Sequence, residues 1–126
     1  MKRVALLGST GSIGEQCLEI VEHLPEHLEI VALAAGRNIS RLAEQARRHR
    51  PDVVACADPN DIEALRAAID DPSITVLAGR EGQQAVGGHT AADVSVAAVV
   101  GFAGLAGTLA AAQAGKRIAL ANKESL

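Results

Sequence analysis

Aromatic side chains are nearly absent from this chain of 126 residues, which contains one Phe and neither Trp nor Tyr. Proteins that bind single-stranded nucleic acids stack the bases on such rings. The formal net charge is −3, so the chain also lacks the excess of Lys and Arg that neutralises a phosphate backbone. Both deficits argue against the usual nucleic-acid-binding classes, and we expect no nucleic-acid partner.

Cysteine and long apolar runs are also scarce. Cys17 and Cys56 are the two cysteines, and they form no C-x-x-C pair. Each lies within an apolar pattern, which predicts two small buried side chains in a reducing compartment. No apolar run approaches the ~20 residues that span a bilayer, and the run after Lys2-Arg3 is too short for a signal peptide. We therefore expect a cytoplasmic protein without a membrane segment. Its 48% hydrophobic residues suffice for the core of one globular domain.

The most informative feature that is present is a glycine-rich segment, Gly-Ser-Thr-Gly-Ser-Ile-Gly, at residues 8–14. It follows an apolar run at 4–7 and opens a helical pattern of apolar residues at 13–24. Glycines allow a tight turn and a close approach of the backbone to a ligand, and the N–H groups at the start of a helix bind anions. The segment, whose hydroxyl groups add donors, predicts the phosphate cradle of a dinucleotide site. Its spacing differs from the common G-x-G-x-x-G, and a strand–turn–helix connection without a ligand is the alternative.

Apolar runs alternate with helical patterns along the chain. Val, Ile, Leu and Ala are nearly continuous in the runs, as in strands that are covered on both faces. The predicted strands are 3–7, 29–34, 53–56, 74–77, 94–100 and 117–121. Further helices are predicted around 39–46 with Asn38 as cap, 59–69 with Asp58 as cap, 81–86, and 105–112 before Gly115. This alternation predicts an α/β fold, a Rossmann-type, doubly wound, mostly parallel sheet flanked by helices.

The end of the second predicted strand bears on the choice of cofactor. NAD sites usually place an Asp or Glu there to accept from the ribose 2′-OH, but residues 33–38 read Leu-Ala-Ala-Gly-Arg-Asn, without an acid. Arg37 offers a cation and planar donors for a phosphate, and Gly36 lets the chain approach it. The segment therefore favours NADP over NAD. The alternative is that Arg37 is a solvated loop cation and Asn38 a simple helix cap.

Asn122, Lys123 and Glu124 follow the sixth predicted strand, at the carboxyl edge that also carries the glycine loop. An amide, a cation and a carboxylate at this edge are able to hold ribose hydroxyls, a nicotinamide edge or an anionic substrate. The alternative is the solvent-facing start of another helix. Because the chain stops at Leu126, beside its own predicted ligand edge, we expect it to be the N-terminal piece of a longer protein.

The four histidines give no metal or nucleophile pattern. His23 and His27 are four residues apart, but Pro25 between them disfavours helical geometry, so we expect a surface loop rather than a metal pair. His49 lies in a basic cluster at a predicted helix end, where positive charge is favourable near the C-terminal dipole. His89 lies in a glycine-rich turn, and no constellation is discernible around it.

Four motifs occur in one order: the glycine loop at 8–14, Ala-Gly-Arg-Asn at 35–38, Gly-Lys at 115–116 and Leu-Ala-Asn-Lys-Glu-Ser-Leu at 120–126. Together they resemble the N-terminal domain of the 1-deoxy-D-xylulose 5-phosphate reductoisomerases, over essentially the whole chain. The last motif is the most specific of the four. The resemblance implies an NADPH-dependent enzyme of the non-mevalonate isoprenoid pathway. Such an enzyme rearranges and reduces 1-deoxy-D-xylulose 5-phosphate to 2-C-methyl-D-erythritol 4-phosphate with a divalent cation, Mg²⁺ or Mn²⁺.

The resemblance also implies a role for each matching residue. The residues that would contact the pyrophosphate of NADPH are Thr10, Gly11, Ser12 and Ile13. Those that would hold the 2′-phosphate of its adenosine ribose are Gly36, Arg37 and Asn38. At the nicotinamide side the ribose would contact Asn122 and Glu124, and the phosphosugar substrate would contact Lys123.

The family's acidic metal ligands, substrate-phosphate loop and dimer-forming region lie downstream of Leu126, so the resemblance implies no catalytic residue and no metal ligand in this chain. Residues 1–126 are expected to be the NADPH-binding domain of a homodimeric enzyme, and alone to bind the cofactor weakly and catalyse nothing. One departure is Gly107, where family members usually have proline near the start of a helix, and glycine should loosen that start. Two alternatives stay open. One is the cofactor domain of another NADP-dependent reductase, similar to semialdehyde dehydrogenases, and the other is a non-enzymatic module that senses NADP(H).

Overall fold

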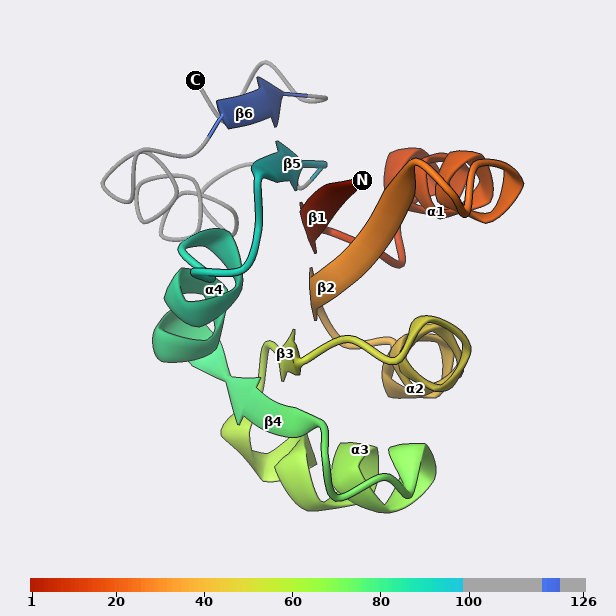
Figure 1. Cartoon of the computed structure of the whole chain (residues 1–126). Helices are drawn as coiled ribbons and strands as arrows, with labels where there is room; N and C mark the ends of the chain where they lie inside the picture. Colours follow the sequence, from red (N-terminus) through yellow and green to blue (C-terminus); the bar gives the residue numbers. More distant parts are fainter. Residues whose placement is uncertain (99–116, 121–126) are drawn as a thin grey trace.

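The computed structural model describes residues 1–98 and 117–120. Within them lies one sheet of six parallel strands in the order β4-β3-β2-β1-β5-β6 (Figure 1). The strands are β1 Lys2–Leu7, β2 Leu28–Ala34, β3 Val53–Cys56, β4 Thr75–Ala78, β5 Val94–Ala97 and β6 Arg117–Leu120. The helices are α1 Ser12–His23, α2 Ile39–His49, α3 Ile62–Ile69, which follows the 3-10 helix η1 Pro59–Asp61, and α4 Gly79–Gly87. The predicted doubly wound α/β fold is confirmed.

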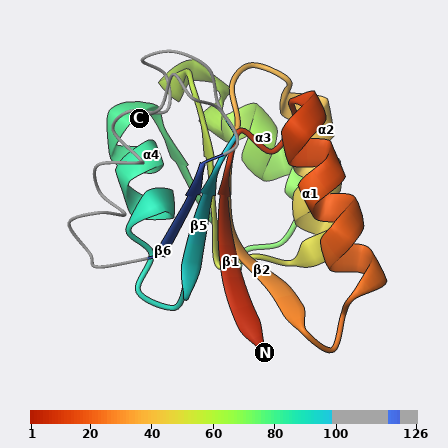
Figure 2. The ribbon, with the colours of Figure 1, turned by 90° about the horizontal axis from the view of Figure 1, so that it is seen from above.

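Helices cover both faces of the sheet, with α1, α2 and α3 on one face and α4 on the other (Figures 1 and 2). Successive side chains of β1 therefore enter different cores. Leu6 belongs to the core that contains Leu18 of α1 and Leu42 of α2, whereas Leu7 belongs to the core that contains Val86 of α4. This arrangement explains why the strands are apolar along their whole length, because each face of the sheet is buried.

The two predicted helix caps are confirmed by hydrogen bonds. The side-chain oxygen of Asn38 accepts from the Arg41 N–H at 3.2 Å, at the start of α2. The Asp58 carboxylate accepts from the Asn60 N–H at 2.9 Å. There, however, the chain first makes the 3-10 helix η1, and α3 begins at Ile62. Both caps satisfy N–H groups that have no partner inside the helix.

Helix α4 is longer than the predicted 81–86, because it begins at Gly79 and ends at Gly87. Gly79 has a φ of +66°, which glycine adopts easily. Gly82 lies so close to β3 that an added Cβ would be 2.8 Å from the Cβ of Ala55. The tight packing of this helix on the sheet thus stabilises residues whose own helix propensity is poor. The predicted helix at 105–112 and Gly115 lie outside the described residues.

Both cysteines have free thiols, and they differ in burial. Cys56, at the end of β3, is fully buried, and Cys17 of α1 is partly buried against the same core. Burial raises the pKa of both thiols, as expected for structural rather than reactive cysteines. Among the described residues, no helix combines the length and the apolar character needed to cross a bilayer.

Candidate functional site

The two predicted loops lie side by side at the carboxyl edge of the sheet. Leu7, the last residue of β1, pairs with Ala34, the last residue of β2. The N–H groups of Gly8 and Ser9 both donate to the Ala34 carbonyl oxygen, at 2.7 and 3.0 Å. The glycine loop and the segment that begins at Ala35 are therefore neighbours, at the edge where doubly wound sheets bind their ligands.

Two of the three loop glycines are required by the turn itself. Gly8 has a φ of +87°, a conformation that side chains rarely allow. A Cβ on Gly14 would lie 2.1 Å from the Gly8 carbonyl oxygen, because α1 folds back tightly onto the loop. Gly11 is different, since its Cβ would be 3.7 Å from that oxygen, an ordinary contact. The protein alone would thus tolerate a side chain at position 11.

The N-terminus of α1 is open to a ligand. Gly11 occupies its N-cap position with extended backbone, and no side chain caps the helix. Gly11, Ser12 and Ile13 are exposed, and Thr10 is half-buried. Uncapped N–H groups at an exposed helix start form an anion site. Ser9 does not join it, because this residue is fully buried and its hydroxyl has no hydrogen-bond partner among the described residues.

Among the described residues, the segment after β2 places an arginine without a partner beside open space. A Cβ on Gly36 would meet no atom within 4 Å, so the protein itself does not require glycine there. Arg37 is exposed, and within residues 1–98 and 117–120 its guanidinium makes no hydrogen bond or ion pair. Asn38 uses its side-chain oxygen as the α2 cap, which leaves its amide NH₂ as a donor. These features fit a phosphate that approaches over Gly36.

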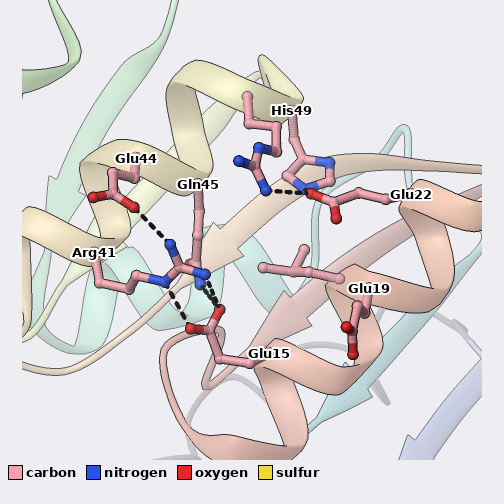
Figure 3. A pocket seen from close by; sticks show the side chains of 9 residues that line it. Glu15, Glu19, Glu22, Arg41, Glu44, Gln45 and His49 are labelled. Carbon is pink, nitrogen blue, oxygen red and sulfur yellow. Dashed lines mark hydrogen bonds and ion pairs between the residues drawn. The ribbon is translucent and has the colours of Figure 1, made fainter.

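Sequence reasoning missed a polar network that joins α1 to α2 (Figure 3). Arg41 donates to both carboxylate oxygens of Glu15, at 2.6 and 3.0 Å. Gln45 is only 3% exposed. Its side-chain amide donates to the Glu15 carboxylate at 2.7 Å and to the Ser9 carbonyl oxygen at 2.9 Å. The Arg41 guanidinium lowers the pKa of Glu15, and Glu15 raises the pKa of Arg41. A glutamine beside the apolar stripe of residues 39–46 was the one signal for this network.

These residues form one wall of a cavity of about 290 Å³ between α1 and α2. Its far end is lined by Glu22, Arg48 and His49. Arg48 donates to Glu22 at 2.9 Å, and the His49 Nε2 lies 3.5 Å from the same oxygen. The predicted basic cluster does lie in the last turn of α2. Burial lowers the pKa of His49, so the positive charge at this helix end comes from Arg47 and Arg48. Four of the lining side chains are carboxylates, which disfavours an anion in the cavity.

The histidines singled out in the sequence lie outside the two loops at this edge. His23 contacts the Glu19 carbonyl oxygen within α1, and His27 lies in the turn before β2. His89, for which no constellation was discernible, has its Nε2 2.8 Å from the Asp52 carboxylate. The described residues hold no group of three or more potential metal ligands. Asn122, Lys123 and Glu124 lie outside the described part of the chain.

A doubly wound parallel sheet with a glycine loop and an open helix start defines a Rossmann-type domain of the dinucleotide-binding class. The sequence model of the 1-deoxy-D-xylulose 5-phosphate reductoisomerase family matches residues 4–126. The chain belongs to this family. Membership rules against the alternative of a semialdehyde-dehydrogenase-like reductase.

Curated relatives and solved structures agree with this assignment. The reductoisomerases of a Synechococcus species and of Anaeromyxobacter sp. strain K are 51% and 52% identical, and each match covers 100% of this chain and 32% of the relative. A crystal structure of DOX-P reductoisomerase with NADPH, fosmidomycin and magnesium has a TM-score of 0.93 at 40% identity, over 100% of this chain and 31% of that one. The Zymomonas mobilis enzyme in complex with NADPH has a TM-score of 0.92 at 39% identity, over 99% of this chain and 33% of that one. The chain thus spans about a third of the length of these relatives.

Proposed function

We propose that residues 1–126 are the NADPH-binding domain of a reductoisomerase that converts 1-deoxy-D-xylulose 5-phosphate to 2-C-methyl-D-erythritol 4-phosphate. The observation that carries the proposal is the pairing of two anion-ready features at one sheet edge. These are the uncapped start of α1 and Arg37, which has no partner among residues 1–98 and 117–120, beside the open space at Gly36. Relatives of the same fold were solved in complex with NADPH.

The residues divide into contacts for different parts of the cofactor. The pyrophosphate is assigned to Thr10, Gly11, Ser12 and Ile13, and the 2′-phosphate to Gly36, Arg37 and Asn38. The nicotinamide ribose is assigned to Asn122 and Glu124, and the phosphosugar substrate to Lys123. When bound, NADPH supplies the hydride for the reduction. The role of this chain is to bind and orient that cofactor.

The rest of the reaction is assigned to sequence that the relatives carry beyond this match. A divalent cation, Mg²⁺ or Mn²⁺, would be held there, and solved structures of DOX-P reductoisomerase contain magnesium. Dimer formation and the catalytic residues are assigned to the same region, and the intact protein is proposed to be a cytoplasmic homodimer. Residues 1–126 without that region would therefore bind NADPH weakly and show no turnover.

Cofactor preference tests the proposal. The intact protein that contains this chain is titrated with NADPH and with NADH by calorimetry. The same two titrations are then made with the Arg37→Ala variant. We expect tighter binding of NADPH, and loss of most of this preference in the variant, since a charged hydrogen bond contributes about 1.5–3 kcal/mol. Arg80→Ala is the matched control, because Arg80 is also exposed and makes no ion pair within the described part of the chain. Equal affinities for both nucleotides, unaffected by Arg37→Ala, would contradict the assignment.

A further inference from the structure

The two halves of the proposed cofactor site, the glycine loop and the segment at 36–38, are connected through α1 and α2 by one chain of hydrogen bonds. Gln45 of α2 reaches the glycine loop at Ser9, and Glu15 connects Gln45 to Arg41. The Arg41 N–H in turn donates to Asn38, in the segment assigned to the 2′-phosphate. Figure 3 shows Glu15, Arg41 and Gln45 meeting between α1 and α2. We propose that Gln45 is a positioning residue, which together with the Glu15–Arg41 pair holds the two phosphate-binding loops in register for NADPH.

Peptide geometry explains how Gln45 acts on the loop. The Ser9 carbonyl group and the Thr10 N–H belong to the same planar, trans peptide unit, so they point in opposite directions. When Gln45 holds the Ser9 oxygen toward α2 at 2.9 Å, the Thr10 N–H is turned away from α2. The Thr10 N–H is one of the donors assigned to the pyrophosphate. Without the Gln45 donor, this peptide unit is free to rotate. Binding must then fix its orientation, and the entropy lost in doing so lowers the affinity for the nucleotide.

Charge balance explains why Arg41 belongs to the same network as Gln45 and Glu15. Glu15 lies in the first turn of α1 and accepts from Gln45 beside the Ser9 carbonyl oxygen. A carboxylate in that place, if left alone, would oppose an anion bound at the same helix start. Arg41 neutralises it through two hydrogen bonds, and Glu44 holds the guanidinium from the other side at 2.6 Å. Arg41 is thus committed to protein contacts rather than to the nucleotide.

The inference rests on the proposed function, and its test measures affinity and stability separately. The probes are NADPH and NADH, titrated into the intact protein as wild type and as Gln45→Leu, which keeps the volume and removes the donor. Ser95→Ala is the matched control. Its hydroxyl is also buried and donates to a backbone carbonyl, that of Gly87, at the far end of α4. Thermal unfolding is recorded for all three proteins.

We expect Gln45→Leu to lower the affinity for both nucleotides about tenfold. This is the order of effect when a buried carbonyl group loses its hydrogen-bond donor. The ratio of NADPH to NADH affinity stays at the wild-type value, because both nucleotides share the pyrophosphate. Ser95→Ala lowers the unfolding temperature without this loss of affinity. If Gln45→Leu lowers the unfolding temperature and leaves both affinities within twofold of wild type, Gln45 is structural only and the inference is wrong.

A second set of variants avoids the buried position. Arg41→Met leaves the charge of Glu15 unneutralised, and we expect it to lower the affinity for NADPH several-fold. In the double variant Glu15→Gln with Arg41→Met, we expect the affinity to return. Restoration supports charge balance, whereas failure of the double variant to recover contradicts it and indicates a direct nucleotide contact by Arg41. A wild-type protein that does not bind NADPH would contradict the proposed function and this inference together. Wild-type binding that survives Gln45→Leu contradicts the inference alone.

Discussion

A Cβ atom on Gly14 would lie 2.1 Å from the Gly8 carbonyl oxygen and 2.8 Å from the Ser9 Cα. Both neighbours are backbone atoms, so the loop itself would have to move. A Cβ on Gly36 meets nothing within 4 Å. Gly14 is thus required by the packing of the fold, whereas packing does not require glycine at position 36, where we propose that the cofactor binds. The glycine spacing pointed to Gly14, and the place at the end of the second strand pointed to Gly36. The sequence did not show that Gly14 is required by packing.

The two glycines give opposite expectations for alanine. Gly36→Ala keeps the stability of the protein or raises it by about 0.5 kcal/mol, because alanine restricts the unfolded chain, while NADPH affinity falls as the methyl group enters the cofactor space. Gly14→Ala, as the contrasting control, lowers the free energy of unfolding by about 1–3 kcal/mol through overpacking. Urea unfolding and NADPH titration of each variant measure both quantities. Unchanged NADPH affinity in Gly36→Ala would show that the space is not used by the cofactor.

The contact between α1 and α2 contains a partly buried titratable group, His49, at the end away from the loops. The His49 side chain is 9% exposed and lies near Glu22 and Arg48. Burial has the largest effect on the pKa of His49 and lowers it. The charge of Glu22 raises this pKa, and the charge of Arg48 lowers it. The folded protein therefore binds a proton on His49 less readily than the unfolded chain does.

This difference makes the stability depend on pH with a defined sign. As the pH falls below the ordinary histidine pKa of about 6.5, the unfolded chain takes up a proton that the folded protein does not, so the free energy of unfolding falls. The slope for one group is at most about 1.4 kcal/mol per pH unit. Urea unfolding at pH 7.5, 6.5 and 5.5 measures it, and His49→Gln is expected to flatten the profile. The pKa values of Glu15, Glu22 and Asp71 are lowered, so their contributions are lost only at more acidic pH. An equally steep profile in the variant would assign the slope to other groups.

Elements with clear periodicity or capping chemistry were predictable. The α2 stripe and its Asn38 cap are present as expected, and so is β3 at Val53–Cys56. Helix α4 was predicted too short, because Gly79 and Gly82 weaken its helical pattern and its stability comes from close packing on β3. The 3-10 helix η1 was also missed, since one proline after a cap does not specify which type of helix follows.

At the scale of the whole molecule, the alternation of strands and helices predicted which segments meet at the carboxyl edge. Parallel strands place all their carboxyl ends together, so the loops at 8–14 and 35–38 had to be neighbours. The network between Glu15, Arg41 and Gln45 was not predictable in the same way. Its members are up to 30 residues apart, and their contact depends on the rotation of two helices about their own axes. The apolar stripes indicate which side of each helix faces the core, but not which polar side chains of the two helices meet.

We propose that this edge binds NADPH, with the pyrophosphate at the start of α1 and the 2′-phosphate at Arg37. A crystal structure of the intact protein with NADPH tests it most directly. We predict that the pyrophosphate lies within hydrogen-bond distance of N–H groups of residues 10–13, and that the Arg37 guanidinium contacts the 2′-phosphate. A cofactor bound elsewhere, for example in the cavity between α1 and α2, or a 2′-phosphate without contact to Arg37, would contradict the account.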